Sequence, residues 1–516
     1  MTQAEIWRQT LGDVLRRTAA RMPHKTAIIC GATTWSYAQL DQTCNALAAG
    51  LSRHGIMRGD RVAVLSRNSH AFVALRFALT RIGAILVPIN FMLKDEEAAY
   101  ILGHTEAKLL CVDSELAPLG RRAAQLSGTV QLFLWLPSEH ATEPAPDMLR
   151  FDTLLGDPGA VPDAGIDGAS LAQIIYTSGT ESRPKGAMLT HQAVISEYVS
   201  VIVDGEIRVD DRILHAMPLF HCAQLDNFLG PSLYVGGTNV ITSKPAPDNI
   251  LPLLGQHRIT SYFSPPTVWI SLLRSALFDK TDLSALKKGY YGASIMPMAI
   301  LQEMQRRLPH LRLWNFYGQT EIAPLAVALQ PEDQIRKAGS TGRPVLNVET
   351  RIIDDAGADV RPGEIGEIVH RSPQLLTGYY RDEERTKIAF EGGWFHSGDL
   401  GVLDEEGYLT IVDRKKDMIK TGGENVASRE VEEVIYRLPA VSEVAVIGLP
   451  DPRWIEAVTA VIVLKKDAAL TEAAVLAHCT QAMAHFKAPK RAYFVEALPK
   501  NPSGKILKHE LRKRFE

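Results

Sequence analysis

Short apolar runs alternate with segments of helical spacing through the first part of the chain, and this alternation is the strongest constraint on its fold. The strand-like runs are Arg61–Leu65, Ala84–Ile89 and Leu109–Val112, and the helical segments are Leu40–Arg53 and Ala71–Ile82. Strands separated by helices usually run parallel, because the helix carries the chain back across the sheet in a right-handed crossover. We therefore predict an α/β fold with mostly parallel sheets flanked by helices.

From Glu349 onward the sequence pattern changes from alternating strands and helices to short strands separated by turns. Short strand-like runs at 350–353, 366–370 and 408–412 are separated by turns rich in Asp, Glu and Gly. This pattern predicts a smaller β-rich lobe beside the α/β part. Residues 137–168, rich in Pro, Asp and Gly, are expected to form a loop region before the next strand.

A compact segment follows the charged run DRKKD at 413–417, which is the candidate linker. Its expected elements are a helix at 428–438, strands at 444–448 and 457–464, and a helix near 471–483. Because 516 residues exceed what one compact core usually holds, a division into domains is expected. We predict an N-terminal domain over 1–413, a hinge linker over 414–417 and a small, mobile α+β C-terminal domain over 418–516.

Composition places the chain among soluble globular proteins and excludes some partners. Hydrophobic residues make up 46% and charged residues 22%, and a net charge of −3 provides no overall basic field for nucleic acid. The five cysteines are far apart, as is typical of buried thiols in a reducing compartment. The sequence shows neither a signal peptide nor a long apolar stretch, so a cytoplasmic enzyme with no transmembrane segment is expected. The basic tail from His485 onward is consistent with a solvated helix end or with a module that meets a nucleotide-like polyanion.

The segment YTSGTESRPKGA at 176–187 is the most informative one. It follows the strand-like run 171–176 and precedes the helix-like segment 190–203. Two glycines, several hydroxyl side chains and a lysine make a turn whose backbone N–H groups can face phosphate oxygens. The order Lys185-Gly186 distinguishes it from a Walker A loop. On spacing alone, a plain glycine-rich turn stays the alternative.

The same loop resembles the phosphate-binding signature of the adenylate-forming superfamily, which includes acyl-CoA synthetases, luciferases and adenylation domains. Further segments resemble the superfamily's other signatures in the same order. They are PLFH at 218–221, YGAS at 291–294, NFYGQTE at 315–321, STGRP at 340–344, GWFHSGD at 393–399, DRKKDMIK at 413–420, GGEN at 422–425 and PKNPSGK at 499–505. An ordered series of this length is specific, and the chain is identified as resembling the fatty-acid–CoA ligases of the superfamily.

The resemblance implies an ATP-dependent acid–CoA ligase that uses ATP, Mg²⁺ and, as co-substrate, coenzyme A. A carboxylate is a poor electrophile, and joining it to the α-phosphate of ATP makes AMP its leaving group. Coenzyme A then accepts the acyl group. Holding two anions together requires positive charge, a metal ion and oriented N–H donors.

The resemblance also assigns the nucleotide contacts. Adenine is expected between 292–294 and 315–317, and Asp399 is expected to accept hydrogen bonds from the ribose. The ordinary alternatives are that Tyr317 is a core residue and that Asp399 belongs to a turn. The full set expected to bind ATP or AMP is Thr177, Ser178, Gly179, Thr180, Lys185, Gly292, Ala293, Ser294, Asn315, Phe316, Tyr317, Gly318, Gln319, Asp399 and Arg414.

Three residues are expected to act on the reacting groups. By resemblance, Thr320 contacts the α-phosphate, Glu321 is the metal ligand, and Lys505 offsets charge as the acyl–phosphate bond forms. The alternatives are that Glu321 begins a helix and that Lys505 is a surface lysine. Glu181-Ser182 stands where many relatives have Thr-Gly or Ser-Gly, so Glu181 is left out of the site.

The second half-reaction is expected to use a rotated C-terminal domain, because Lys505 would block the approach of the thiol. The position that matches the hinge of the superfamily is Lys416. The loop expected to line the pantetheine channel contains glycines, which allow the backbone to approach the ligand closely. The residues expected at the hinge and the coenzyme A channel are Lys416, Lys420, Gly422, Gly423 and Glu424.

The acid itself is the least constrained part of this interpretation. The pocket is expected to contain His221, Cys222, Ala223, Gln224, Tyr291 and Ala323. Gln224 and Asp226 would add polarity if they faced inward, and His221 is equally consistent with a hydrogen-bonded core histidine. The stretch PLFHCAQLDNFLGPSLYVGG at 218–237 resembles fatty-acyl ligases more than acetyl or amino-acid ones, and no acidic anchor for an amino acid is evident. We therefore favour a medium- or long-chain fatty acid, with an aryl acid such as a cinnamate second.

Other functions share the same motifs. An adenylating enzyme that loads a carrier protein would be expected to have a carrier-domain neighbour, and a luciferase-like oxygenase would use the same adenylate. A non-catalytic nucleotide-binding protein is disfavoured by the intact Lys505, Glu321 and Asp399. The expected partners are small molecules, and a homodimer is one assembly left open.

Overall fold

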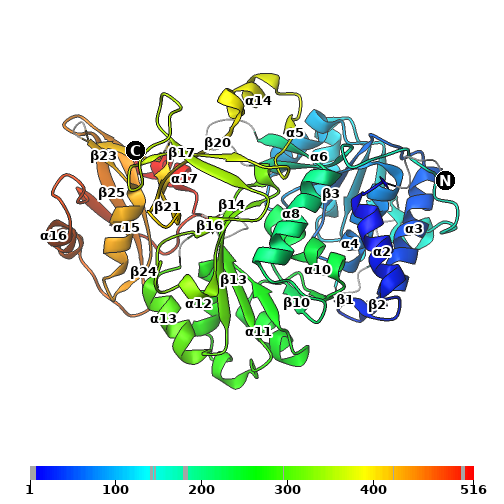
Figure 1. Ribbon diagram of the computed structural model, residues 1–516, viewed down its shortest axis with the longest axis horizontal. Helices are drawn as coiled ribbons and strands as arrows, with labels where there is room; N and C mark the ends of the chain where they lie inside the picture. Colours follow the sequence, from blue (N-terminus) through cyan, green and yellow to red (C-terminus); the bar gives the residue numbers. More distant parts are fainter. Residues whose placement is uncertain are drawn as a thin grey trace.

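The computed structural model describes residues 7–139, 143, 147–177, 184–294, 296–415, 417–421, 424–500 and 506–516. Four β-sheets organise these residues, and Figure 1 shows them spread along the long axis, with the C-terminal elements at the end opposite the N-terminus. Sheets I and II, with the helices around them, form the larger part. Sheet III is a lobe beside them, and sheet IV belongs to the C-terminal unit.

Sheet I carries the segment that leads into the predicted phosphate loop. In spatial order its strands are β19 (Gly378–Tyr379), β9 (Lys185–Thr190), β8 (Leu171–Thr177), β4 (Ile85–Pro88), β3 (Arg61–Leu65), β5 (Leu109–Val112), β6 (Leu132–Trp135) and β7 (Leu149–Arg150). The strands from β8 to β7 pair in parallel, whereas β8–β9 and β9–β19 are antiparallel.

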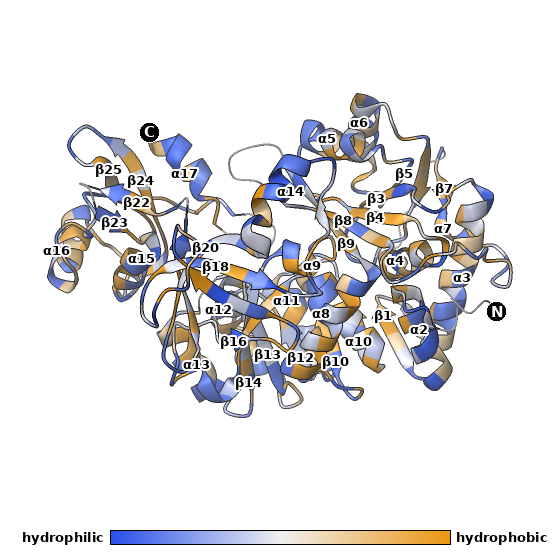
Figure 2. Ribbon diagram, turned by 45° about the horizontal axis from the view of Figure 1, so that its top comes forward, coloured by the Kyte–Doolittle hydropathy of each residue, from blue (hydrophilic) through white to orange (hydrophobic). Residues whose placement is uncertain are grey.

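The apolar runs of sheet I are buried on both faces, which is why they lack polar alternation. In β3, Val62 and Val64 pack into one core cluster while Ala63 and Leu65 pack into another. Figure 2 shows β3 and β4 as largely hydrophobic strands. The two-faced burial explains how a continuous apolar run can be a strand of only a few residues.

Sheet II carries the predicted nucleotide and acyl segments. In spatial order its strands are β16 (Arg343–Pro344), β15 (Leu325–Leu329), β14 (Arg312–Gly318), β13 (Lys288–Gly292), β12 (Ser261–Phe263), β10 (Arg212–His215), β11 (Thr238–Ile241), β1 (Thr26–Cys30) and β2 (Thr33–Ser36). The strands from β14 to β1 pair in parallel, so their carboxyl ends meet at one edge. In sheets of this kind, ligands bind outside the carboxyl ends of the strands.

Helices fill three layers around sheets I and II. One core cluster joins both sheets to the helices α2 (Leu11–Arg21), α3 (Tyr37–Arg53), α4 (His70–Ile82), α8 (His191–Asp204) and α10 (Gly230–Val235). The outer face of sheet I is covered by α5 (Asp95–Thr105) and α6 (Ala117–Ser127). A further cluster joins sheet II to α11 (Pro247–Gln256), α12 (Pro266–Arg274) and α13 (Met298–Arg307).

The remaining elements of this part are short. They are α7 (Phe151–Leu154), α9 (Cys222–Gln224), the π-helix η1 (Leu225–Leu229), α14 (Glu383–Ala389) and the 3₁₀ turns η2 (Phe278–Lys280), η3 (Thr320–Ile322), η4 (Pro331–Asp333) and η5 (Glu391–Gly393). The π-helix follows α9 directly and widens the turn. Such single π-turns are frequent at functional sites.

Sheet III and sheet IV follow in the second half of the chain. Sheet III contains β17 (Glu349–Ile353), β18 (Gly366–Arg371), β20 (Phe395–Leu403) and β21 (Leu409–Arg414). The C-terminal unit contains β22 (Ile419–Thr421), β23 (Glu424–Val426), α15 (Ser428–Tyr436), β24 (Val441–Asp451), β25 (Ile455–Leu464), α16 (Glu472–Ala482), β26 (Arg491–Phe494) and α17 (Lys508–Phe515). Its core clusters contain only residues of this unit, as expected for an α+β module.

The predicted α/β architecture with a β-rich lobe is confirmed, and most predicted elements lie within a few residues of the observed ones. The predicted loop 137–168 was incomplete, because β7 and α7 form within it. The five cysteines are unpaired and buried, as expected. Among the described residues, no helix is long and apolar enough to span a membrane.

A buried polar network joins sheet I to the predicted acyl segment. Arg76 of α4 forms an ion pair with Asp226 of η1, donates to Gln173 Oε1 of β8 at 2.7 Å and to the Tyr198 hydroxyl of α8 at 3.0 Å. Gln173 Nε2 in turn donates to Asp226 Oδ2 at 2.8 Å. Arg76 is 2% exposed and Asp226 is fully buried, so each charge depends on the other for compensation.

Glu197 lies next to this network without belonging to it. Both of its carboxyl oxygens are buried and have no hydrogen-bond partner among the described residues. Burial, with the nearby Asp226 charge, raises the pKa of Glu197 well above its usual value. Glu197 therefore holds its proton to a higher pH in the folded chain than in the unfolded chain.

Replacing Arg76 should destabilise the fold strongly. Arg76→Met leaves Asp226 as an unpaired buried charge, and losing one partner of a buried ion pair typically costs about 3–5 kcal/mol of unfolding free energy. Denaturant unfolding followed by circular dichroism measures the change. Arg122→Met is the matched control, because Arg122 pairs with Asp95 at the surface and should change stability little. Equal losses in the two variants would contradict the role of the network.

Replacing Glu197 should stabilise the fold, and the gain in stability should depend on pH. A raised folded-state pKa means that the folded chain binds more protons than the unfolded chain, so the stability of the wild type falls as pH rises above about 4.5. Glu197→Gln removes this loss. Its melting temperature should match the wild type near pH 4.5 and exceed it increasingly toward pH 8, as measured by thermal unfolding. A gap that stays constant with pH would show that Glu197 is ionised in the fold.

Candidate active site

The base of the predicted phosphate loop is an antiparallel hairpin. Thr177 ends β8, Lys185 begins β9, and the two residues pair directly across it. Ser178, Gly179 and Thr180, predicted to bind phosphate, and Glu181, left out of the site, lie outside the described residues. The strand β9 was missed from the sequence, and its burial pattern does not alternate as a half-buried strand would. The hairpin holds both ends of the loop at the edge where β8 ends.

The two predicted nucleotide segments end neighbouring strands. Gly292 of β13 pairs with Phe316 of β14, and a Cβ atom at 292 would lie 2.4 Å from the Phe316 carbonyl oxygen, so only glycine fits. Ala293 adopts a φ of +64°, which is strained for a residue with a side chain. Ser294 is exposed. The strained turn therefore leaves its polar groups open at the end of the strand.

Tyr317 is linked to Asp399 rather than being an ordinary core aromatic residue. Its hydroxyl donates to Asp399 Oδ2 at 2.7 Å, and Arg414 Nε lies 3.5 Å from Asp399 Oδ1. Burial, followed by the Asp399 charge, raises the pKa of Tyr317 well above its usual value. Asp399 and Arg414 pair between β20 and β21. A carboxylate offers about four lone-pair sites, so Asp399 keeps capacity for a sugar hydroxyl.

The motif at 340–344 forms hydrogen bonds that hold one of these segments, 315–317, against sheet III. Asn315 Nδ2 donates to the Ser340 carbonyl oxygen at 3.3 Å. The hydroxyls of Ser340 and Thr341 both donate to the Leu409 carbonyl oxygen, at 2.6 and 3.0 Å. This contact ties sheet II to sheet III and fixes the position of Asn315.

The acyl and nucleotide segments meet at Cys222 and Thr320. The Cys222 sulfur lies 3.3 Å from Thr320 Oγ1. Gly318 is required nearby, because a Cβ atom there would lie 1.9 Å from the Pro324 carbonyl oxygen. Phe316 packs in the core and Gln319 is half-buried between Gly318 and Thr320. The structure thus brings the two predicted segments together.

Most of the predicted acyl-pocket residues lie around that meeting point. His221 caps α9, because its Nδ1 accepts the backbone N–H of Ala223 at 3.1 Å. Cys222 and Ala323 belong to one core cluster, and Ala223 packs against the cluster that contains Tyr291. The Tyr291 hydroxyl donates to Gln334 Oε1 at 2.7 Å.

Asp226 does not supply the polarity expected of the acyl segment. Asp226 is fully buried and its carboxylate is committed to Arg76, so it does not add polarity to the pocket. Gln224 is also buried, and its Nε2 bonds His215 Nδ1 at 2.7 Å. Sequence reasoning treated the two residues alike because their side chains are both polar and near His221.

Glu321 has the environment expected of a metal ligand shared with a nucleotide. It is 8% exposed, and Tyr379 donates a hydrogen bond to its Oε1 at 3.0 Å. Burial raises the pKa of Glu321, and Tyr379 and the charge of Lys185 oppose that shift. No group of three or more His, Cys, Asp or Glu side chains suited to a metal occurs in the part of the chain that is described. Mg²⁺ is often held by one carboxylate plus substrate phosphates, so Glu321 fits such an ion.

Two predicted residues that the structure describes, Lys420 and Glu424, are not joined to this site. Lys505, Lys416, Gly422 and Gly423 lie outside the described residues. Lys420 and Glu424 are exposed on the β22–β23 hairpin, and within the described ranges neither bonds to the nucleotide segments. Figure 1 places β23 at the outer side of the C-terminal unit, away from β14.

Sequence reasoning missed Tyr379, which contacts the site, and Arg429, which joins the C-terminal unit to β21. Tyr379 bonds to Glu321 and lies under the Lys185 ammonium, whose Nζ is 5.0 Å from the ring centroid. Arg429 of α15 donates to the Ile411 carbonyl oxygen at 2.6 Å, and the charge of Asp399 acts on it. Neither residue stands in a recognised motif, and no local pattern indicates their long-range contacts.

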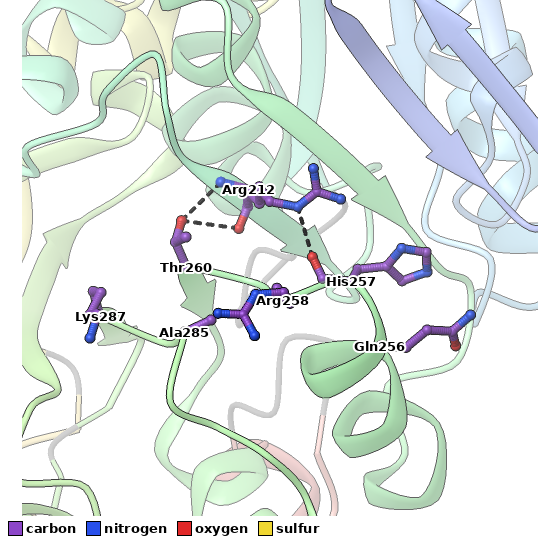
Figure 3. Close-up of a pocket in the computed structure, with 7 residues that line it drawn as sticks. All are labelled: Arg212, Gln256, His257, Arg258, Thr260, Ala285 and Lys287. Carbon is purple, nitrogen blue, oxygen red and sulfur yellow. Dashed lines mark hydrogen bonds between the residues drawn. The ribbon is translucent and has the colours of Figure 1, made fainter.

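A large surface pocket lies elsewhere and does not belong to this site. Its volume is about 490 Å³, and it is lined by Arg212, Gln256, His257, Arg258, Thr260, Ala285 and Lys287. Figure 3 shows Arg212 bonded to Thr260 and to the His257 carbonyl oxygen. Arg212 begins β10, so this pocket lies at the amino ends of the strands. The predicted residues instead gather at the carboxyl ends.

Comparison with known proteins adds an independent line of evidence. Residues 15–380 match the family described as AMP-binding enzyme, and residues 430–505 match the AMP-binding enzyme C-terminal domain. A feruloyl-CoA synthase of an Amycolatopsis species is 37% identical over 507 residues, covering 98% of this chain and 99% of that protein. The long-chain-fatty-acid–CoA ligase FadD13 of Mycobacterium tuberculosis is 34% identical, covering 98% and 99%.

The fold comparison agrees with these relatives. The crystal structure of the anthranilate CoA ligase AuaEII in complex with anthranoyl-AMP superposes with a TM-score of 0.90. It is 27% identical, and the match covers 99% of each chain. The likeness extends over the full length of both proteins and includes the C-terminal unit.

Neutralising Asp399 should weaken nucleotide binding without disturbing the fold. Asp399→Asn keeps an acceptor for the Tyr317 hydroxyl but removes the charge that strengthens hydrogen bonds to a ribose. Such bonds are typically worth about 1.5–3 kcal/mol, so ATP affinity should fall about 10- to 100-fold in calorimetric titration. Asp404→Asn, a turn residue of the same lobe, is the control and should bind ATP normally. Unchanged affinity in Asp399→Asn would remove Asp399 from the site.

Proposed function

Because the chain belongs to the family of AMP-binding enzymes and is an AMP-forming acid–thiol ligase, we propose that its acid substrate is aromatic. The ligase activates a carboxylate with ATP as an acyl-adenylate and passes the acyl group to coenzyme A. The contact between Cys222 and Thr320 carries the assignment of the reacting centre, because it joins the acyl segment to the nucleotide segment.

In the first step a carboxylate oxygen attacks the α-phosphorus, and the bond to the β-phosphate oxygen breaks to release pyrophosphate. Lys185 and the loop that it closes hold the β- and γ-phosphates, and Thr320 faces the α-phosphate. Asp399, backed by Tyr317 and Arg414, holds the ribose. The site works by positioning two anions and balancing their charge, so it needs no proton transfer.

Mg²⁺, when bound, would neutralise phosphate charge and polarise the phosphoryl oxygens. Glu321 would hold it, and its burial keeps competing water away from the carboxylate. Lys505, from the C-terminal unit, would offset the charge that develops between the carboxylate and the α-phosphate.

In the second step the sulfur of coenzyme A forms a bond to the acyl carbonyl carbon and loses its thiol proton to solvent, and AMP leaves with the electron pair of the broken acyl–phosphate bond. We assign residues 1–413 to one domain, 414–417 to a hinge at Lys416 and 418–516 to the second domain. Lys420, Gly422, Gly423 and Glu424 would line the coenzyme A channel after rotation.

The orientation seen here is held by contacts that cross the proposed hinge. Asp413 Oδ2 accepts hydrogen bonds from the backbone N–H and the hydroxyl of Ser428, at 2.7 and 2.8 Å. Arg429 adds its bond to Ile411. A rotation of the second domain would require these bonds to be exchanged for water.

Buried acceptors support an aromatic acid that carries a donor group. Gln224 Oε1 and Asn227 Oδ1 are buried and have no hydrogen-bond partner among the described residues. The Gln224 amide is oriented by His215, whose other nitrogen bonds Asn239 Oδ1 at 2.9 Å. Burial lowers the pKa of His215 to about 4, so it is neutral and can accept from Gln224 Nε2. A buried acceptor favours a substrate that supplies a donor.

The relatives are consistent with this choice but leave a second candidate. The similar proteins include one named for feruloyl-CoA and one solved with anthranoyl-AMP. A medium- or long-chain fatty acid is the second candidate, because FadD13 is nearly as similar. The apolar Cys222 and Ala323 would suit either an alkyl chain or a ring.

The substrate class should be decided by a panel of acids. The chain is incubated with ATP, Mg²⁺, coenzyme A and matched aromatic and fatty acids, and AMP and acyl-CoA are measured by mass spectrometry. We expect kcat/KM at least tenfold higher for an aromatic acid with a hydroxyl or amino group than for its unsubstituted parent, and higher than for any fatty acid.

Each other outcome of the panel points to a different function. A preference for fatty acids would replace the proposed substrate class by the second candidate. Acyl-AMP without thioester would indicate a carrier-protein acceptor. Light emission that depends on oxygen would indicate a luciferase-like oxygenase, and no turnover with any acid would contradict the proposed function.

A further inference from the structure

One short segment, Leu376–Tyr380, connects the phosphate-loop strand to the turn that carries Glu321. Its backbone pairs with β9 through Gly378 opposite Met188 and Tyr379 opposite Ala187. The Tyr380 N–H also donates to the Gly186 carbonyl oxygen at 2.8 Å. At its other end, the Leu376 N–H donates to the Glu321 carbonyl oxygen at 2.8 Å. We call Leu376–Tyr380 the bridging segment.

The side chain of Tyr379 repeats this connection with two separate interactions. Its hydroxyl donates to Glu321 Oε1 at 3.0 Å, and the face of its ring lies 5.0 Å from the Lys185 ammonium nitrogen. The distance to the ring lies within the range of a cation–π interaction. One side chain therefore contacts both the carboxylate and the cation expected to surround the polyphosphate.

Tyr379 is itself held firmly in place. It is 7% exposed, and its backbone N–H donates to Thr386 Oγ1 of α14 at 2.8 Å. The same threonine hydroxyl donates to the Asp382 carbonyl oxygen at 2.7 Å. A side chain fixed by packing and by such bonds can hold the groups that it contacts in one geometry.

The two interactions have different consequences for the bound nucleotide. The hydrogen bond occupies one oxygen of Glu321 and leaves the other to face a ligand, which fixes the rotation of the carboxylate. The ring attracts the ammonium of Lys185 and limits where this long side chain can lie. Fixing both groups before the nucleotide arrives reduces the entropy lost on binding.

We propose that Tyr379 is a positioning residue that holds Glu321 and Lys185 in register around the polyphosphate of ATP. The proposal rests on the proposed function, because it takes Glu321 and Lys185 to face the nucleotide. The proposal adds that the carboxylate expected to bind the metal and the lysine expected to bind phosphate are both held by the side chain of Tyr379. Substitutions of Tyr379 can distinguish the effect of its hydroxyl from the effect of its ring.

The test measures ATP affinity by calorimetric titration of the full chain, once with Mg²⁺ and once with EDTA. Tyr379→Phe keeps the ring and loses the hydroxyl, so it should reduce the gain in ATP affinity that Mg²⁺ provides by at least fivefold and leave affinity in EDTA unchanged. Tyr379→Leu loses both, so it should also weaken ATP binding in EDTA. In the adenylation assay, Tyr379→Phe should need more Mg²⁺ for half-maximal rate and recover the wild-type kcat at high Mg²⁺.

Two controls separate positioning from general damage. Tyr380→Phe changes the next residue, whose ring packs against His104 at 5.6 Å, and should leave the Mg²⁺-linked gain unchanged. In a double-mutant cycle, adding Tyr379→Phe to Glu321→Gln should reduce the Mg²⁺-linked gain no further. A lowered kcat that Mg²⁺ does not restore would indicate a structural role only.

The failure of the inference differs from the failure of the proposed function. If the wild type binds ATP with a clear Mg²⁺-linked gain and Tyr379→Phe keeps that gain, the inference about Tyr379 is overturned and the ligase assignment stands. If the wild type does not bind ATP in either condition, both are overturned. Tyr379→Phe alone decides the hydroxyl interaction, even if Tyr379→Leu does not fold.

Discussion

The ion pair between Arg76 and Asp226 is the interaction on which the geometry of the site most depends. It joins α4 to η1, and through Gln173 it reaches β8, the strand that ends at the phosphate loop. Both charges are buried, so neither can be solvated if the other moves away. The network therefore fixes the helical acyl segment relative to β8 of sheet I, which leads into the predicted phosphate loop. Its value lies in this fixed geometry more than in net stability, since buried ion pairs often gain little over apolar packing.

The fold was largely predictable because its signals are local. The runs Arg61–Leu65 and Leu109–Val112 are bounded by turns and are apolar apart from Arg61, and they form β3 and β5 with those limits. Nothing local predicted that Lys185–Thr190 would be a strand, because its partners are β8 and the distant Tyr379. The motifs located the candidate site by resemblance. They did not reveal that Tyr317 bonds Asp399, or that Asp226 is committed to Arg76, since both facts depend on tertiary contacts.

The candidate site combines buried residues with residues that are exposed to solvent. Glu321, Thr320 and Cys222 are buried, whereas Ser294 and Gly318 are exposed at the ends of their strands. Under the proposed function, a polyphosphate would enter from the open side and its charge would meet ligands in a drier region, where electrostatic interactions are stronger. Strain at Ala293 and close backbone contact at Gly292 shape the boundary between the two regions. The C-terminal unit contacts β21 of sheet III through Ser428 and Arg429, from across the linker.

The pairing of β19 with β9 also affects how the chain folds while it is being synthesised. Met188 pairs with Gly378, so at about 5–20 residues per second roughly 10 to 40 s of translation separate the two strands. Until then, β9 is an edge strand with unpaired backbone groups, which can pair with other chains. The nascent phosphate-loop strand is therefore open to misassembly for longer than most of sheet I. Chaperone binding to ribosome-bound chains should be concentrated in this interval, and fragments that end before residue 378 should aggregate.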